Sequence, residues 1–135
     1  MLNFVIIKAV VGGSVMASNS DLIIEKLKNW NCDIDGVMDR FLGNKDFYVE
    51  LLNEVPSQVE FINLGKHLKE NDIKDSFADA HTLKGVLANM GLTPMFNEVC
   101  DIVEPLRIGS MDGVNEHYLN LLKELDFLKK ILILG

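Results

Sequence analysis

From Asp21 to Leu132 the apolar residues of this chain recur every three or four positions, and this period constrains the fold more than any other feature. Such spacing places apolar side chains along one side of an α-helix, whereas a half-buried strand needs strict alternation. Three prolines and ten glycines in 135 residues are too few for the many turns of a β-sandwich or β-barrel. The pattern therefore predicts an all-α domain.

Short polar turns divide this pattern into helices. Two short helices are expected first, one capped by Asp21 and one opened by Asp33 or Asp35. Four long amphipathic helices follow, over about residues 46–68, 72–90, 93–109 and 112–132. We expect Pro56 to kink the first of these rather than end it. Long helices joined by short turns predict an antiparallel up-down-up-down four-helix bundle with short additional N-terminal helices.

The first residues stand apart from this pattern. Phe4–Val11 form an apolar run that Gly12-Gly13 stops, well short of the roughly 20 residues that span a bilayer. The run also lacks the basic region that precedes a signal-peptide core. We expect residues 1–20 to be an unassigned N-terminal extension, with Met16 as an alternative translation start, and residues 21–135 to form one domain.

Charge and cysteine content exclude several classes of function. Thirteen Lys and Arg against twenty Asp and Glu give a net charge of -7, which argues against nucleic-acid binding because that affinity comes from clustered cations. Cys32 and Cys100 lie far apart without CxxC spacing, so we expect two reduced thiols in a cytoplasmic protein. We expect no membrane association and a monomer, with weak self-association through the apolar N-terminal run and Ile131–Leu134.

His81 is the one histidine whose surroundings suggest chemistry. Successive helix residues turn by about 100°, so each side chain can be placed around the helix. His81 falls outside the apolar arc that contains Ala80, Leu83 and Leu87. The residues expected beside it on the outward side are Lys74, Gly85 and Asn89, with Phe77 and Ala88 as an apolar rim.

The neighbours of His81 along the helix suit a phosphoryl carrier. An exposed imidazole is partly neutral near neutral pH and is then nucleophilic. Lys84, three residues on, can neutralise an added phosphoryl group as a point charge. Gly85 is unfavourable inside a helix by about 1 kcal/mol relative to Ala. We attribute this glycine to the close approach of another protein, which a side chain would block.

The other histidines lack such neighbours in the sequence. His67 and His117 each stand in a polar helical context, and the three histidines lack the i, i+4 spacing of a metal site, so we expect no metal or other cofactor. A hydrolase that used His81 as general base would need an orienting carboxylate. Asp79 and Asp101 have the chemistry, but Asp79 is two positions from His81 and cannot face it along a helix.

The segment Ala80-His81-Thr82-Leu83-Lys84-Gly85, followed by Asn89-Met90-Gly91-Leu92, resembles the signature of histidine-containing phosphotransfer (HPt) domains of two-component phosphorelays. Ile34–Asn44 also resembles the short helix that enters such a domain, and the likeness covers about Ile34–Leu132. The resemblance implies a four-helix bundle in which His81 accepts a phosphoryl group on Nε2. Lys84 would stabilise that group, and Gly85 would leave room for the partner.

The resemblance also implies the partners. These are response-regulator receiver domains and a sensor or hybrid histidine kinase, with the phosphoryl group moving between receiver aspartates or from the kinase to a response regulator. Receivers are expected to dock on the outward face, over Lys74, Phe77, Ala88 and Asn89. The Mg²⁺ belongs to the receiver's acidic pocket, so the carrier needs no cofactor of its own.

Two further expectations follow from the resemblance. Some family members place a glutamine on the following helix, within reach of the phosphoryl group; the matching position here is Val103, so Lys84 is expected to be the main phosphate partner. Such a carrier is a phosphotransfer protein rather than a self-contained enzyme. The alternative is a non-transferring HPt-like binding module that sequesters a receiver or kinase through the same face.

Overall fold

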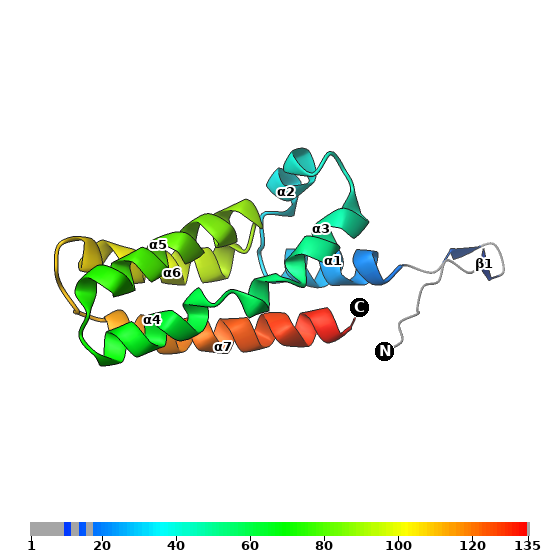
Figure 1. Cartoon of the computed structure of the whole chain (residues 1–135). Coiled ribbons are helices and arrows are strands. Elements are labelled where there is room, and N and C mark those ends of the chain that lie inside the picture. Colours follow the sequence, from blue (N-terminus) through cyan, green and yellow to red (C-terminus); the bar gives the residue numbers. More distant parts are fainter. Residues whose placement is uncertain (1–9, 12–13, 16–17, 135) are drawn as a thin grey trace.

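The computed structural model describes residues 10–11, 14–15 and 18–134 (Figure 1). Its helical elements are α1 (Asn19–Asn29), α2 (Ile34–Arg40), α3 (Lys45–Leu52), the 3₁₀ turn η1 (Val55–Ser57), α4 (Glu60–Lys69), α5 (Ile73–Asn89), α6 (Thr93–Arg107) and α7 (Val114–Ile133). Two short strands, β1 (Val10–Val11) and β2 (Ser14–Val15), pair antiparallel, which the sequence pattern did not predict. The proposed start at Met16 lies outside the described residues.

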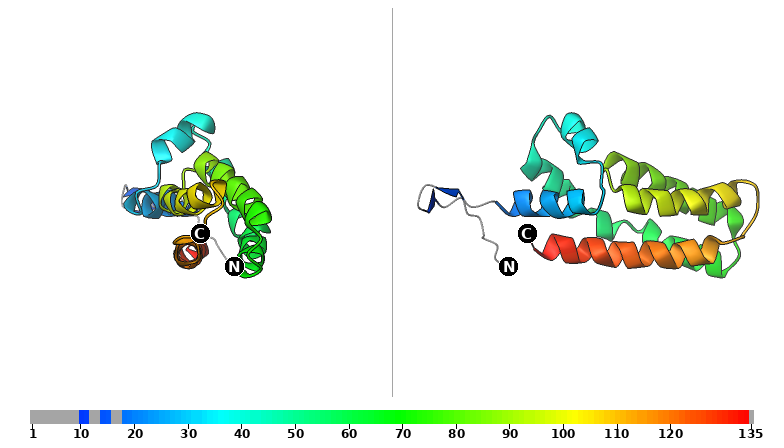
Figure 2. Two further views of the ribbon diagram at one scale, coloured as in Figure 1. Left: turned by 90° about the vertical axis from the view of Figure 1, so that its left-hand side faces the viewer. Right: turned by 180° about the vertical axis from the view of Figure 1, so that it is seen from behind.

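Helices α4 to α7 form an antiparallel four-helix bundle, as predicted. Helix α5 packs between α4 and α6, and α6 packs against α7. The α4–α5 turn and the α6–α7 connection lie at one end of the bundle, and the α5–α6 turn lies at the other (Figure 1). Viewed along the helices, α5 and α6 form one side of the bundle and α4 and α7 the other (Figure 2, left). None of the described helices has the length and apolar character that a membrane span requires.

Short polar side chains set where the helices begin. Asp33, Asn44 and Asp72 each accept a hydrogen bond from the backbone N–H three residues on, at 3.0–3.1 Å. Ser18, rather than the predicted Asp21, caps α1, and Asp21 completes a capping box with it. The first helix therefore begins within the predicted extension over residues 1–20.

The expected kinked helix over residues 46–68 is wrong, because Pro56 interrupts it completely. Helix α3 ends at Leu52, a 3₁₀ turn follows, and α4 starts at Glu60. Proline has no N–H and its ring clashes with the carbonyl four residues earlier, so α3 does not pass through it. Val55 is 2% exposed and anchors the turn in the core. The bundle consequently receives a short α4 of 10 residues against the 20 of α7.

Helices α1 to α3 (residues 18–52, the N-terminal unit) close one end of α5. The last carbonyls of a helix have no partner within it and need donors from elsewhere. The Asp33 N–H, the Arg40 guanidinium and the Tyr48 hydroxyl supply these donors, at 2.8–3.2 Å from the carbonyls of residues 88–91. Tyr48 is fully buried, and burial raises the pKa of its phenol. The N-terminal unit thus holds the helix that carries His81.

The extra length of α7 packs against α1. The rings of Trp30 and Phe127 meet edge to face with centroids 4.8 Å apart. Cys32 is buried and Cys100 half-buried, and neither forms a disulfide within the described residues. Burial raises the pKa of the Cys32 thiol to about 12, so this sulfur stays protonated at neutral pH.

Candidate functional site

His81 lies in the middle of α5 with its side chain exposed. The opposite side of the helix is anchored in the core, where Ala80, Leu83 and Leu87 are fully buried. This anchoring fixes the rotation of α5 and so directs the imidazole to the surface, as the helical spacing predicts. The imidazole therefore lies on the exposed side of α5.

Phe77 links His81 to α6. Its half-buried ring packs with the centroid 5.7 Å from that of the His81 imidazole. The Arg107 guanidinium lies over the Phe77 ring, with its Cζ atom 5.2 Å from the ring centroid. Arg107 also contacts the carboxylate of Glu104, with 3.3 Å between Nε and Oε1. Lys74 lines the same hollow as Phe77 and Arg107.

Arg107 is a site residue that sequence reasoning missed. It is far from His81 in the chain and belongs to the next helix, so periodicity on α5 could not reveal it. The only signal in the sequence is its position in the last turn of α6, where a cation favours the helix dipole. The packing of α6 against α5 places this arginine beside Phe77, where Lys74 is the other cation.

Lys84 and Gly85 flank the histidine on the following turn. Lys84 is half-buried. Burial raises the pKa of the Cys100 thiol on α6, and the positive charge of Lys84 partly offsets this rise. A Cβ built on Gly85 would meet no described atom within 4 Å. Packing within the fold therefore does not require a glycine at this position, and the surface beside His81 is kept low.

The remaining predicted site residues lie further along α5. Ala88 and Asn89 are exposed, and their carbonyls accept hydrogen bonds from Arg40. Val103, which matches the family's glutamine position, is fully buried in α6. Its side chain faces the core rather than the surface around His81. The cations of this site are Lys74 and Lys84 from α5 and Arg107 from α6.

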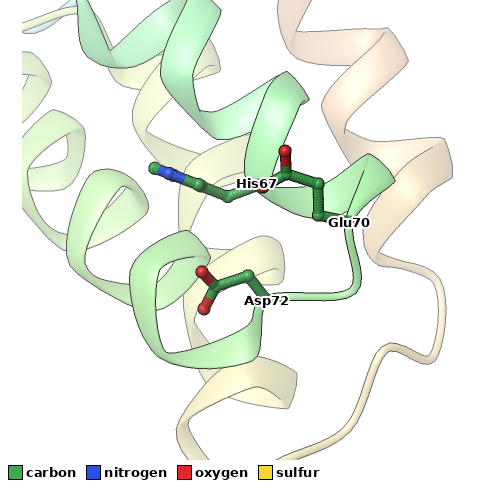
Figure 3. Close-up of side chains that lie close together, drawn as sticks. All are labelled: His67, Glu70 and Asp72. Atoms are coloured by element: carbon green, nitrogen blue, oxygen red, sulfur yellow. The ribbon is translucent and has the colours of Figure 1, made fainter.

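The local sequence suggested that His67 is an isolated polar residue, but the structure gives it a carboxylate partner. Its Nδ1 lies 2.6 Å from a carboxylate oxygen of Asp79, and this hydrogen bond is the main cause that raises the pKa of His67. Glu70 and Asp72 lie nearby at the turn between α4 and α5 (Figure 3). Asp79, considered above as a partner for His81, therefore serves another histidine.

His117 is held in a similar way between α6 and α7. Its Nδ1 contacts a carboxylate oxygen of Glu98, which raises the pKa of His117, and Asp101 lies 3.9 Å away. Each histidine group has donor types and spacings that a metal ion could use. The i, i+4 criterion missed both groups because their members come from different helices and turns. His67 belongs to α4 and His117 to α7, whereas His81 belongs to α5.

The comparison with protein families identifies the bundle. A family model described as Hpt domain matches residues 46–129. Comparisons with curated proteins and with solved structures returned no match. The matched residues hold α4, α5 and α6 and nearly all of α7, and thus the whole surface around His81. This chain belongs to the Hpt domain family, whose members have a histidine phosphotransfer role in two-component signalling.

Proposed function

We propose that this protein is a phosphorelay intermediate that carries a phosphoryl group on His81, between receiver-domain aspartates or from a histidine kinase to a response regulator. The observation that carries the proposal is the open surface beside the imidazole. Gly85 leaves that surface clear without any packing reason within the described fold. Lys84 stands on the same turn, ready to neutralise a phosphoryl group.

The transfer needs a neutral imidazole with its proton on Nδ1. The lone pair on Nε2 of His81 attacks the phosphorus of an aspartyl phosphate, and an N–P bond forms as the P–O bond to the carboxyl group breaks. The electron pair of that bond leaves on the receiver's carboxylate, and the Nδ1 proton passes to water. Positioning and charge neutralisation do most of the work in such a step.

The surface around His81 suits the docking of a receiver. Phe77 and Ala88 offer apolar contact on either side of the imidazole. Lys74 and Lys84 place positive charge there in a chain of net charge -7, whereas Arg107 is paired with Glu104, so the two lysines would attract an acidic receiver pocket. The Mg²⁺ would come with the receiver.

The proposal includes a transient complex with the receiver in the cytoplasm, with the protein as a monomer. Signalling encounters of this kind bury little surface and separate readily. Ile133, near the C-terminal end, is 78% exposed. Because exposed apolar surface can mark an interface, the proposal includes weak self-association through this end.

Phosphorylation of the isolated protein tests the proposal. Wild type and His81→Ala are incubated with phosphoramidate, a small donor that needs no receiver, and then with phosphorylated receivers of the host. Wild type is expected to gain one acid-labile, base-stable phosphoryl group by intact mass, and His81→Ala none. His67→Gln and His117→Gln serve as matched controls that keep His81.

Equal labelling of His81→Ala and wild type would overturn the proposal. Receiver binding by wild type without any transfer, despite labelling by phosphoramidate, would favour the non-transferring binding module instead. Retention of circular dichroism by His81→Ala is expected, because the replaced side chain is exposed.

A further inference from the structure

The side of the bundle away from His81 carries a groove between α4 and α7. It encloses about 640 Å³, and its apolar wall includes Phe61, Ile62, Leu122 and Leu125. His81 and its neighbours Phe77 and Arg107 belong to α5 and α6, which form the opposite side (Figure 2, left). The groove is therefore outside the face described above.

A close contact between α4 and α7 shapes the floor of this groove. The Tyr118 ring lies against Gly65, and its hydroxyl donates to the Phe61 carbonyl at 2.7 Å. A Cβ on Gly65 would come within 2.9 Å of the Tyr118 Cζ atom, so a larger residue here would displace the Tyr118 ring. Above this floor Ile62 is 77% exposed, and no described residue covers it.

The charged side chains that line the groove have one sign. The charged side chains among its described lining residues are Lys66, Lys69 and Lys129. Acidic residues outnumber basic ones by twenty to thirteen in the whole chain, so three lysines here run against the overall composition. Because α4 and α7 run antiparallel, Lys69 and Lys129 stand towards opposite ends of the groove. An occupant thus meets positive charge towards both ends of the groove, from Lys66 and Lys69 at one end and Lys129 at the other.

The length of the groove suits a helix. Tyr118 to Lys129 covers eleven residue steps of α7, or about 16 Å at 1.5 Å per residue. That length matches about three turns of a docked helix. On α4 the lining residues 62, 65, 66 and 69 follow the i, i+3, i+4, i+7 spacing of a single stripe. An apolar stripe flanked by acidic side chains is the complement of this surface.

We propose that the α4–α7 groove binds an acidic amphipathic helix of a partner protein other than the receiver. Leucine-like side chains of that helix would cover Ile62 and Leu122, and its carboxylates would pair with Lys66, Lys69 and Lys129. Since His81 lies on the opposite side, the partner and a receiver can be bound together. The bundle then serves as an adaptor as well as a carrier.

Titration with a designed helical peptide tests this inference. The probe has about three turns, with a leucine stripe flanked by glutamates; a matched peptide carries lysine in place of each glutamate. We expect the acidic peptide to shift amide resonances within residues 56–69 and 118–129 in ¹H–¹⁵N spectra. Resonances of residues 77–88 are expected to stay in place, and the lysine peptide is expected to bind at least about tenfold more weakly.

Charge-reversal variants provide the control. Lys66→Glu with Lys69→Glu is expected to weaken the acidic peptide about tenfold, whereas Lys26→Glu with Lys28→Glu, an equal charge change on exposed positions of α1, leaves it unchanged. Ile62→Ser is also expected to weaken binding, and the exposure of Ile62 keeps that variant folded. Equal binding by the Lys66/Lys69 variant, or shifts centred on α5 and α6, would overturn the proposal. Dilution shifts of the groove resonances in the protein alone would also overturn it, because a second copy would then be the occupant.

Discussion

Glu124 is an ionisable side chain whose charge opposes folding. It lies half-buried on α7, and its Oε1 atom is buried without a hydrogen-bond donor among the described residues. Burial raises the pKa of Glu124 to about 7, and the nearby Glu98 carboxylate adds to the effect. A neutral side chain of the same shape should therefore stabilise the fold. Glu124→Gln is such a change.

The size and the pH window of this effect follow from the pKa. A carboxyl whose pKa is raised by folding holds its proton more tightly in the folded state, so stability falls as the pH rises from the unfolded pKa through the folded one. For Glu124 that window runs from 4.5 to about 7. At about 1.4 kcal/mol per pH unit the upper limit is about 3 kcal/mol. Water reaches part of the side chain, so we expect about 1–2 kcal/mol for Glu124→Gln above the window.

Urea unfolding at two pH values measures this gain. At about pH 8 the Glu124→Gln protein is expected to unfold at a higher urea midpoint than wild type, whereas at about pH 5 the two midpoints nearly coincide. Glu50→Gln, at an exposed position of α3, removes the same charge and is the matched control. An equal gain at both pH values, or no gain at about pH 8, would refute the assignment of the cost to a buried carboxylate. A gain of the same size in Glu50→Gln would instead point to net charge.

Three further substitutions test other parts of the structure. Gly85→Ala is expected to raise the melting temperature, because Ala favours a helix by about 1 kcal/mol and the new Cβ meets no described atom within 4 Å. The same variant should take up phosphoryl groups from a receiver more slowly than wild type. An unchanged rate would contradict the role given to Gly85. Gly65→Ala should lower the urea-derived stability by about 1–3 kcal/mol, because the methyl group displaces the Tyr118 ring; full stability would show that the ring can shift freely. Asp79→Asn should lower the pKa of His67 in an NMR titration, and it should cost more stability below pH 6.5 than at high pH. The contact with Asp79 raises the pKa of His67, so it stabilises the fold while His67 is protonated, and this stabilisation is lost as the pH rises through the pKa of folded His67. An unchanged His67 titration in the variant would contradict this contact.

Much of α5 could be predicted because its signals are local. Asp72 caps its start and Gly91, with φ of +69°, follows its end, so both boundaries depend on residues next to them. The exposure of His81 follows from the same helix, since the apolar arc fixes its rotation. The effect of Pro56 is not set by local sequence alone, because a proline can bend a helix or end it. The burial of the neighbouring Val55, a tertiary contact, favours the break that the structure shows.

Contacts between helices could not be predicted from one sequence. Arg107 contacts Phe77 only because α6 packs beside α5 in a particular position along the helix axis, and no local sequence pattern encodes that position. The pairing of His67 with Asp79 has the same origin, since it joins α4 to α5. The sequence therefore supports the identity of the nucleophile candidate better than the set of charges that surround it.

The hydrogen bonds from the N-terminal unit to the end of α5 have a consequence for protein engineering. The family match begins at residue 46, after Asp33 and Arg40 but before Tyr48. A fusion protein built from the matched residues alone would keep one of the three donors and leave the carbonyls of Ala88, Asn89 and Gly91 to water. With roughly 1 kcal/mol lost for each hydrogen bond, the last turn of α5 would fray. A portable unit of this protein therefore has to include Asp33 and Arg40, which both lie before the family boundary.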